Sequence, residues 1–185
     1  MSGPLQGYRV LELGSTVAGP FCGRLLADFG AEVIKVEPPE GDVMRQWPPL
    51  SQGFSENFAS INRGKQSVLL DLKNPEQRDQ ARQLVLGADV LIENYRAGAF
   101  EALGLGYEDL KKINPQLIYC SMTGFGQDGP RRSHTAYDHA VQATHAGGHA
   151  GLQLDFAQAR ALGGRRRMVV QERLRPLTPL RAYHL

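Results

Sequence analysis

The sequence predicts an α/β fold, in which helices cover both faces of a mostly parallel β-sheet. Short apolar runs typical of buried strands alternate along the chain with segments whose apolar residues have helical spacing. The composition, with 42% hydrophobic and 22% charged residues, is that of an ordinary globular domain. Strands that alternate with helices favour a parallel sheet, because each parallel crossover needs a connection long enough to hold a helix.

The first three expected elements make a βαβ unit. Residues 8–13 and 32–37 are expected to be strands, since both are short apolar or β-branched runs next to glycine or proline. Between them, Pro20 suits the first turn of a helix and Gly30 suits its left-handed end. Units of this kind are right-handed in nearly all proteins.

The alternation continues after a long interruption. Residues 38–64 have no clear period and are expected to form an excursion, which within a domain is usually functional. Asn74 is expected to cap the next helix, with Pro75 in the following position. The remaining expected elements are strands at 67–72, 89–95 and 116–122, a helix ending near residue 86, and short helices at 99–103 and 107–113.

The alternation stops after residue 144, which divides the chain into residues 1–144 and an Arg-rich tail, 145–185, expected to be irregular. Residues 146–185 contain seven Arg, two acids and no Lys, and Met168–Val170 is their only strand-like stretch. Two interpretations stay open. The tail is either a basic extension that binds an acidic partner, or a segment translated out of frame from a GC-rich gene.

Several kinds of protein and site are not favoured by the residues. No apolar run reaches the roughly 20 residues of a membrane span, so a cytoplasmic protein without membrane contact is expected. The net charge of +2 combines −3 for residues 1–145 with +5 for residues 146–185. The basic tail could suggest nucleic acid, but nucleic acid binding is not expected. Cys22 and Cys120 are expected to be buried, reduced thiols. The histidines lack zinc spacing and the glycines lack G-x-G-x-x-G spacing, although Glu37 stands where a ribose-binding acid would. Neither a metal nor a nicotinamide cofactor is expected.

A longer pattern runs through the first 144 residues. Its motifs follow in a fixed order: Val10-Leu11-Glu12-Leu13, Ala18-Gly19-Pro20-Phe21, residues 26–39, Asn62-Arg63-Gly64-Lys65, Leu70-Asp71-Leu72-Lys73, Glu93-Asn94-Tyr95-Arg96, residues 103–107 and 118–126, and Ala136-Tyr137-Asp138. In this order and spacing, the chain resembles the amino-terminal half of the large domain of a family III (CaiB/BaiF-type) coenzyme A transferase.

The resemblance implies a partial Rossmann-like parallel sheet, with the small domain of the family missing. It also implies the reaction of the family, in which coenzyme A moves from an acyl-CoA thioester to a carboxylic acid through an acyl anhydride on an Asp. The covalent step divides one difficult acyl transfer into easier ones. Coenzyme A is then a substrate, and no permanently bound cofactor is expected. A homodimer is expected for the family but not for this chain, which lacks the small domain and the returning carboxyl-terminal segment.

The resemblance also assigns candidate binding residues by position. Leu70 and Lys73 fall where the family lines the nucleotide end of coenzyme A, with Lys73 facing a phosphate as a point charge. Asn94 and Tyr95 fall where the family holds the pantetheine–adenine portion, and Asp138 matches an acidic position near the active-site loop. Each also has a plainer interpretation. Leu70 could be a core residue, Lys73 a solvated lysine and Asn94 a turn cap. Tyr95 could be a packed ring, and Asp138 an acid in the first turn of a helix.

No catalytic residue is identified. Asp155 resembles the family's nucleophilic Asp locally, but it follows Asp138 too closely and lacks a glycine-framed turn. A chain of this extent is therefore expected to be inactive. The alternatives are a non-catalytic coenzyme A binding fragment and an α-methylacyl-CoA racemase-like enzyme. The racemase is less favoured, because Tyr137 stands where racemases of the family have His.

The out-of-frame interpretation of the tail makes a direct prediction. Reading the gene in its other two frames after codon 145 is expected to reveal the remainder of the family sequence. If neither frame continues the family sequence, this interpretation is wrong and the tail is a genuine basic extension.

Overall fold

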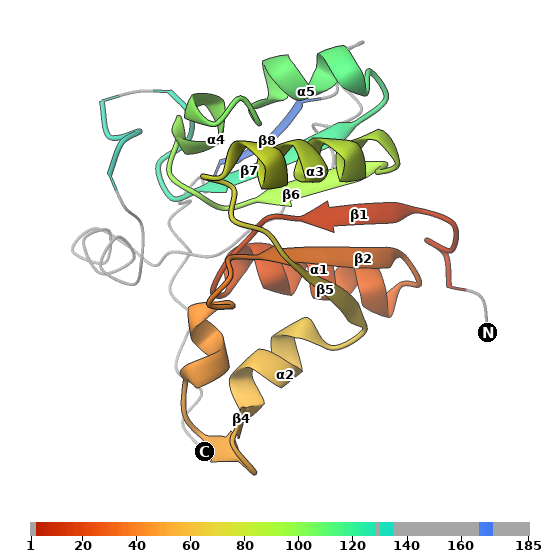
Figure 1. Cartoon of the computed structure of the whole chain (residues 1–185), viewed down its shortest axis with the longest axis vertical. Coiled ribbons are helices and arrows are strands. Elements are labelled where there is room, and N and C mark those ends of the chain that lie inside the picture. Colours follow the sequence, from red (N-terminus) through yellow and green to blue (C-terminus); the bar gives the residue numbers. More distant parts are fainter. Residues whose placement is uncertain (1–2, 129, 135–166, 172–185) are drawn as a thin grey trace, which may run out of the picture.

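A parallel β-sheet of six strands forms the centre of the protein in a computed structural model (Figure 1). The structure describes residues 3–128, 130–134 and 167–171. The strand order across the sheet is β5-β2-β1-β6-β7-β8. These strands are β1 (Arg9–Glu12), β2 (Glu32–Glu37), β5 (Lys65–Leu69), β6 (Val90–Glu93), β7 (Ile118–Thr123) and β8 (Arg167–Gln171). Counted along the chain, the order is that of a Rossmann-type sheet, so the predicted α/β class is confirmed.

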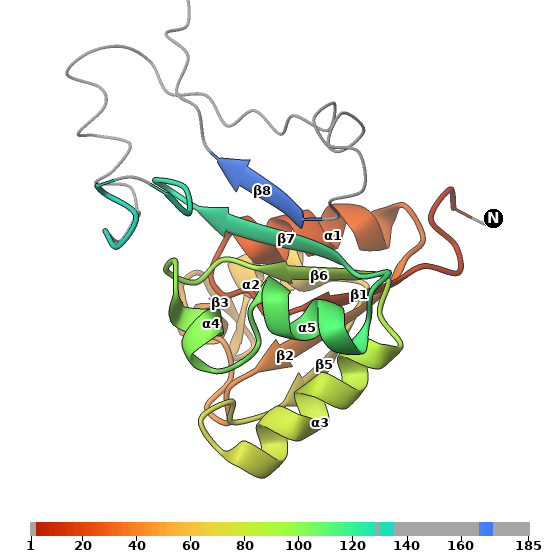
Figure 2. The ribbon, with the colours of Figure 1, turned by 90° about the horizontal axis from the view of Figure 1, so that it is seen from above.

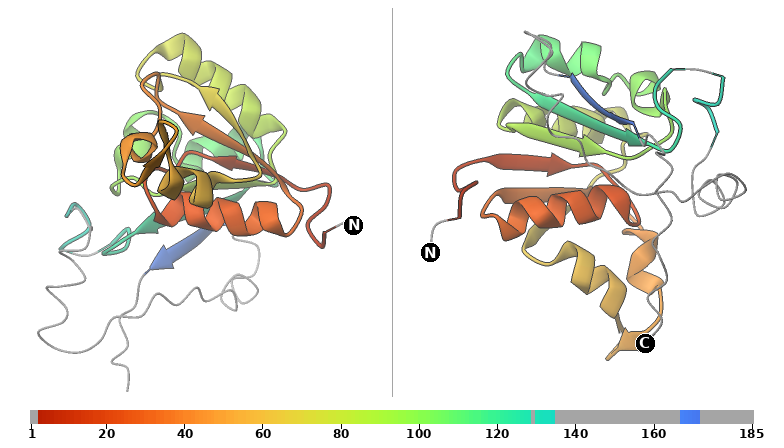
Figure 3. Two further views of the ribbon diagram at one scale, coloured as in Figure 1. Left: turned by 90° about the horizontal axis from the view of Figure 1, so that it is seen from below. Right: turned by 180° about the vertical axis from the view of Figure 1, so that it is seen from behind.

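Helices lie on both faces of this sheet. Viewed along the sheet, α1 lies on one side and α3 on the other (Figure 2, Figure 3). Asn74 begins α3 as expected, since its side-chain oxygen accepts hydrogen bonds from the backbone N–H groups of Glu76 and Gln77. The helices around the sheet are α1 (Ala18–Asp28), α3 (Pro75–Leu86), α4 (Ala99–Ala102) and α5 (Tyr107–Ile113).

Two separate apolar clusters hold the layers together, because successive residues of a strand point to opposite faces. Leu11 and Leu91 pack in the cluster that includes residues of α3, α4 and α5. Their neighbours Val10 and Ile92 pack in the other cluster, against residues of α1. All four side chains are at most 1% exposed. The middle strands are therefore buried on both faces, which explains their continuous apolar sequence.

The excursion between β2 and β5 has more structure than its sequence predicts. It contains a single 3₁₀ turn, a two-stranded hairpin and a short helix, each stabilised locally. Asp42 and Ser55 cap the turn and the helix by accepting backbone N–H groups of Met44 and Phe58. Elements this short do not repeat long enough to give a recognisable period. They are η1 (Val43–Gln46), β3 (Leu50–Ser51), β4 (Phe54–Ser55) and α2 (Glu56–Asn62).

The tail that was expected to be irregular includes one strand. β8 pairs in parallel with β7, in a register that sets Tyr119 opposite Arg167 and Thr123 opposite Gln171. Its sequence contains two adjacent β-branched residues, and β7 would otherwise present an open edge with unpaired backbone groups. Residues 145–166 and 172–185 lie outside the described part of the chain, so the domain boundary at residue 144 stays a prediction.

The two cysteines lie in the apolar cluster beneath α1. Cys22 belongs to α1 and Cys120 to β7, and both are free thiols. Burial is the main cause that raises the pKa of Cys22 to about 11 and that of Cys120 to about 12. Both thiols therefore stay protonated at neutral pH and are poor nucleophiles. Within the described residues, no helix has the length and apolarity needed to cross a bilayer.

The two-sided burial of the middle strands gives a testable difference between two leucines. Leu91 in β6 is 0% exposed, whereas Leu86 at the end of α3 is 53% exposed. Leu91→Ala is expected to lower the free energy of unfolding by about 2–5 kcal/mol, because it leaves a cavity. Leu86→Ala, the matched control, is expected to change it by less than about 0.5 kcal/mol. Urea unfolding followed by circular dichroism measures both, and equal losses would contradict the described packing.

Candidate functional site

The candidate site lies at the carboxyl edge of the sheet, where strand order reverses. From β1 the chain passes through α1 to β2 on one side, and it later returns through α3 to β6 on the other side of β1. In sheets of this type, ligands bind outside the carboxyl ends of the strands at such a reversal. The segment between β1 and α1, residues 13–17 and called the β1–α1 loop below, lies at this point.

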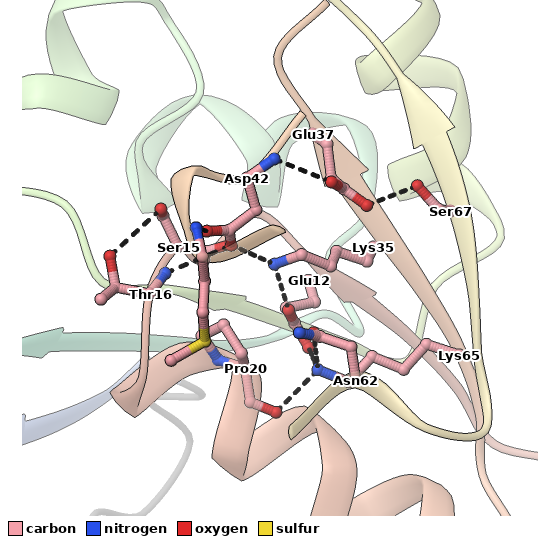
Figure 4. Close-up of polar contacts among 12 residues, drawn as sticks. Glu12, Ser15, Thr16, Pro20, Lys35, Glu37, Asp42, Asn62, Lys65 and Ser67 are labelled. Atoms are coloured by element: carbon pink, nitrogen blue, oxygen red, sulfur yellow. Dashed lines mark hydrogen bonds and ion pairs between the residues drawn. The ribbon is translucent and has the colours of Figure 1, made fainter. Parts of the chain in front are cut away.

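Four buried charged side chains lie beneath this loop (Figure 4). The Lys35 ammonium lies 3.0 Å from a carboxylate oxygen of Glu12 and 3.0 Å from one of Asp42. The Lys65 ammonium lies 2.7 Å from the other oxygen of Glu12. All four side chains are at most 2% exposed, so two positive and two negative charges balance one another out of contact with water. These residues, called the buried charge network below, are Glu12, Lys35, Asp42 and Lys65.

The backbone around the β1–α1 loop is held by side chains from other elements. Lys35 donates to the carbonyl oxygen of Gly14 at 2.8 Å, and Lys65 donates to that of Pro20 at 2.7 Å. The amide of Asn94 makes two hydrogen bonds with Ser15, accepting from its N–H at 2.8 Å and donating to its carbonyl at 2.9 Å. The loop conformation therefore depends on contacts with β2, β5 and the end of β6.

Three glycines let the chain approach these side chains closely. A Cβ on Gly14 or Gly19 would lie 3.0 Å from the side-chain oxygen of Asn94. A Cβ on Gly23, in the middle of α1, would lie only 2.0 Å from a carboxylate oxygen of Glu12. Glycine costs helix stability relative to alanine, so its presence inside α1 is explained by the space that the buried carboxylate occupies.

Glu37, at the end of β2, is fully engaged by protein groups. Arg45 contacts both of its carboxylate oxygens at 2.7 Å, Ser67 donates to one at 2.6 Å, and the backbone N–H of Asp42 donates to the other at 2.9 Å. Burial by itself raises the pKa of Glu37, but the hydrogen bonds from Arg45, Ser67 and Asp42 outweigh it and lower the pKa to about 2. The carboxylate is therefore ionised and already paired, which does not fit the role of a ribose-binding acid.

The structure places the sequence-predicted binding residues in two groups. Leu70 follows β5, is 6% exposed and belongs to the apolar cluster under α3, whereas Lys73 is exposed a few residues later. Asn94 and Tyr95 directly follow β6. β5 and β6 are three strand spacings apart, or about 14 Å at about 4.8 Å each. An extended ligand could therefore contact both groups along the same edge, while a small one could not.

Tyr95 combines a packed face with an accessible one. Its ring lies 5.1 Å from that of Phe100, centre to centre, and the residue is 39% exposed. Burial is the main cause that raises its pKa, and the carboxylates of Asp42 and Glu93 add to the effect. The phenol is therefore neutral at physiological pH and can offer an aromatic surface and a hydrogen-bond donor to a ligand.

Sequence analysis missed the buried charge network as a structural unit. Its signal was nevertheless present, because Glu12 and Lys35 interrupt apolar strands at positions where water is excluded, and a charge there requires a partner. The candidate acids Asp138 and Asp155 lie outside the described residues. Among those described, no cluster of His, Cys, Asp and Glu is arranged to hold a metal ion.

Comparisons with known proteins match this chain to CoA-transferases. The chain matches the model of one protein family, CoA-transferase family III, over residues 5–154, which extends past the boundary expected at residue 144. It is 49% identical over 147 residues to a succinate–glutarate CoA-transferase from Agrobacterium fabrum, covering 75% of this chain and 37% of that protein. It is 48% identical over 136 residues to a succinyl-CoA–D-citramalate CoA-transferase from Chloroflexus aurantiacus, covering 72% of this chain and 34% of that protein.

A solved structure is similar over the same region. The chain is 47% identical to a CaiB/BaiF family protein from Brucella suis, with a TM-score of 0.74 and coverage of 78% of this chain and 39% of that one. The chain therefore spans about a third of the length of the curated relatives named above.

The engagement of Glu37 predicts a pH dependence of stability. Its pKa is about 2 in the folded protein and about 4.3 in an unfolded chain. The stabilisation is therefore complete above about pH 4.3 and is lost as the pH falls toward 2. At pH 7, Glu37→Gln is expected to lower the free energy of unfolding by up to about 3 kcal/mol.

Urea unfolding of wild type and Glu37→Gln at pH 7, 4 and 2.5 measures this effect. The difference between the two proteins should shrink slightly at pH 4 and fall to about a quarter of its pH 7 value at pH 2.5. The exposed neighbour Glu40 provides the control, since Glu40→Gln should change stability little at any of the three values. A Glu37→Gln difference that does not depend on pH would contradict the assigned pairing.

Proposed function

Because the chain belongs to CoA-transferase family III, we propose that residues 3–128 form the coenzyme A binding part of an enzyme that moves coenzyme A from an acyl-CoA to a carboxylic acid. The observation that carries the proposal is the family match over residues 5–154, together with a loop held rigidly at the ligand-binding edge of the sheet. Whole-enzyme activity is itself part of the proposal, because the chain spans about a third of its named relatives.

The proposed reaction conserves the energy of the thioester. A carboxylate of an Asp attacks the acyl carbon, the C–S bond breaks, and coenzyme A leaves as a thiolate, which leaves a mixed anhydride on the Asp. The thiolate then attacks the Asp carbonyl of this anhydride, which releases the donor acid and leaves an Asp–coenzyme A thioester. The acceptor carboxylate attacks that thioester, the C–S bond breaks again, and a mixed anhydride of the acceptor and the Asp remains. The thiolate finally attacks the acceptor's carbonyl, which forms the new acyl-CoA and frees the Asp carboxylate. No external oxidant, reductant or metal is required, since each step exchanges one nucleophile for another at an acyl carbon.

The residues at the carboxyl edge suit the parts of coenzyme A. Lys73 is exposed and can approach a phosphate as a point charge. Tyr95 offers an accessible aromatic surface to the pantetheine or adenine portion. Asn94 uses its amide to hold Ser15, so its proposed contribution is to shape the pocket wall. Leu70 belongs to the apolar core, and we propose that it supports the site by packing rather than by contact with the ligand.

The nucleophile is not assigned to any described residue. Glu12 and Asp42 are paired with buried lysines, and Glu37 is paired with Arg45, so none of these acids is free to attack a thioester. Asp138 stays a candidate for a position near the active-site loop, and Asp155 stays a weak candidate for the nucleophile. We therefore propose that this 185-residue polypeptide binds coenzyme A but has little or no transfer activity by itself.

Two alternatives have distinct consequences. A non-catalytic coenzyme A binding fragment would bind the ligand in every context and never exchange acyl groups. A racemase-like enzyme would exchange the α-proton of a 2-methylacyl-CoA with solvent, although Tyr137 stands where racemases of the family have His. For either alternative we propose the cytoplasm as the location and acyl-CoA as the partner. We propose that this chain is not a homodimer by itself.

Coenzyme A binding gives the first test. Isothermal titration calorimetry with coenzyme A is expected to detect binding by the wild type, and Lys73→Ala is expected to weaken it about 3- to 10-fold through loss of a phosphate contact. The control is Lys112→Ala, which removes the same charge at the end of α5, close to the amino edge of the sheet. Equal weakening in both variants would indicate a general charge effect rather than a site at Lys73.

Acyl transfer gives the second test. Incubation of the 185-residue protein with succinyl-CoA and glutarate is expected to produce no glutaryl-CoA detectable by mass spectrometry. This pair is chosen because the Agrobacterium relative is named for these two acids. A protein in which the chain continues with the remainder of the family sequence is expected to produce it. Turnover by the 185-residue protein alone would refute the proposal of an inactive chain.

A further inference from the structure

We propose that the buried charge network of Glu12, Lys35, Asp42 and Lys65 positions the β1–α1 loop for ligand binding, and that these four residues are positioning residues. The inference rests on the proposed function, because it concerns the loop at the proposed coenzyme A site. It adds a set of buried residues, none of which is expected to touch the ligand, that determine whether the loop has its binding conformation.

Burying the four charges of the network has a desolvation cost in free energy that stability alone does not account for. Each charge loses its hydration when it is buried, and burial lowers the pKa of the Lys65 ammonium against the raising effect of Glu12. Buried ion pairs in other proteins can often be replaced by well-packed apolar residues without loss of stability. The apolar clusters above and below the same strands show that this fold packs apolar side chains readily. A role beyond packing is therefore needed to explain four charges at this place.

The contacts of the two lysines indicate that role. A lysine ammonium has three N–H donors, and the ion pairs with carboxylates do not occupy all of them. In each lysine, one remaining donor bonds to a backbone carbonyl oxygen in or beside the loop. Lys35 donates to Gly14 at the start of the loop, and Lys65 donates to Pro20 in the first turn of α1. Lys35 therefore fixes the backbone within the loop, and Lys65 fixes it just after the loop, at Pro20 (Figure 4).

Asp42 holds the middle of the loop. Its carboxylate accepts the backbone N–H of Thr16 at 3.2 Å, and the same oxygen contacts Lys35 at 3.0 Å. Thr16 has a φ of 66°, a left-handed conformation that is unfavourable for a β-branched residue. Such a conformation persists only where its surroundings impose it. Asp42 is the surrounding group that accepts its N–H, so the network holds the loop in a conformation it would not adopt alone.

The network also brings distant segments to the loop. Lys65 donates to the side-chain oxygen of Asn62 in α2 at 2.8 Å. Asp42 belongs to the excursion, and its backbone N–H is bonded to Glu37. Glu12 lies on the middle strand, and α1 reaches it because Gly23 has no side chain. A change in any of these segments is therefore transmitted to the β1–α1 loop through buried contacts.

The test separates positioning from folding by a balanced substitution. Lys65→Met alone leaves an excess negative charge buried and is expected to lower the urea midpoint strongly. Glu12→Gln/Lys65→Met removes one charge of each sign and leaves the Lys35–Asp42 pair intact, so most of the stability is expected to return. The donor to Pro20 is still absent, and coenzyme A affinity is expected to stay about tenfold below wild type, because the loop must now be ordered on binding.

Two further measurements make the result decisive. Amide hydrogen exchange of residues 13–21 is expected to be faster in Glu12→Gln/Lys65→Met than in wild type, while exchange in β6 and β7 is unchanged. Val85→Ala is the control for stability alone, since Val85 is fully buried on the opposite face of the sheet under α3. It is expected to lower the urea midpoint while leaving coenzyme A affinity and loop exchange as in wild type.

The outcomes distinguish this inference from the proposed function. If the balanced variant binds coenzyme A as wild type does and keeps its loop protection, the network serves folding alone and the inference is overturned. If wild type binds no coenzyme A, the proposed function fails, and the exchange rates of residues 13–21 still decide whether the network holds the loop. Faster amide exchange of residues 13–21 together with weaker coenzyme A binding in the balanced variant supports both the positioning role of the network and the proposed function.

Discussion

The buried carboxylate of Glu12 is the interaction on which the rest of the structure depends. It lies on the middle strand β1, and its two oxygens contact two different lysines, one from β2 and one from β5. A single charge thus links three neighbouring strands on the face that α1 covers. Because an unpaired carboxylate at this depth would be very unfavourable, only an arrangement that brings both lysines to it is stable. The same arrangement requires Gly23 in α1 and fixes the loop that follows β1.

Apolar and charged side chains occupy different ends of the same strands. On the α1 face, β1 and β2 begin with apolar residues, Val10 and Val33, and end with charged ones, Glu12 and Lys35. The apolar end packs against α1, and the charged end holds the β1–α1 loop at the edge where ligands of such sheets bind. This division suits a protein of the CoA-transferase family, since the edge can be shaped for coenzyme A without disturbing the core. Among the described acids of this region, Glu12, Asp42 and Glu37 are each paired with a basic side chain.

The sequence predicted the fold well, whereas its assignment of binding residues stays a prediction. The five strands expected from apolar runs are present, because strands buried on both faces require such runs. The short elements between β2 and β5 were not predicted, since each is shorter than two periods. Among the candidate binding residues, Asn94 uses its amide to hold Ser15, and Leu70 lies in the core. Resemblance assigned these residues by position, and their contacts with coenzyme A stay predictions.

The sequence by itself determined the order of strands and helices, the family, and the presence of charges within apolar strands. These depend on local patterns and on motif order, which the linear chain contains. The tertiary structure alone decided which charges meet. Lys35 and Glu12 are 23 residues apart, and Lys65 is farther still, yet all three converge because the parallel register aligns Glu12 with Lys35 and Val33 with Lys65. That register is a property of the assembled sheet, since it results from backbone hydrogen bonds between strands distant in sequence.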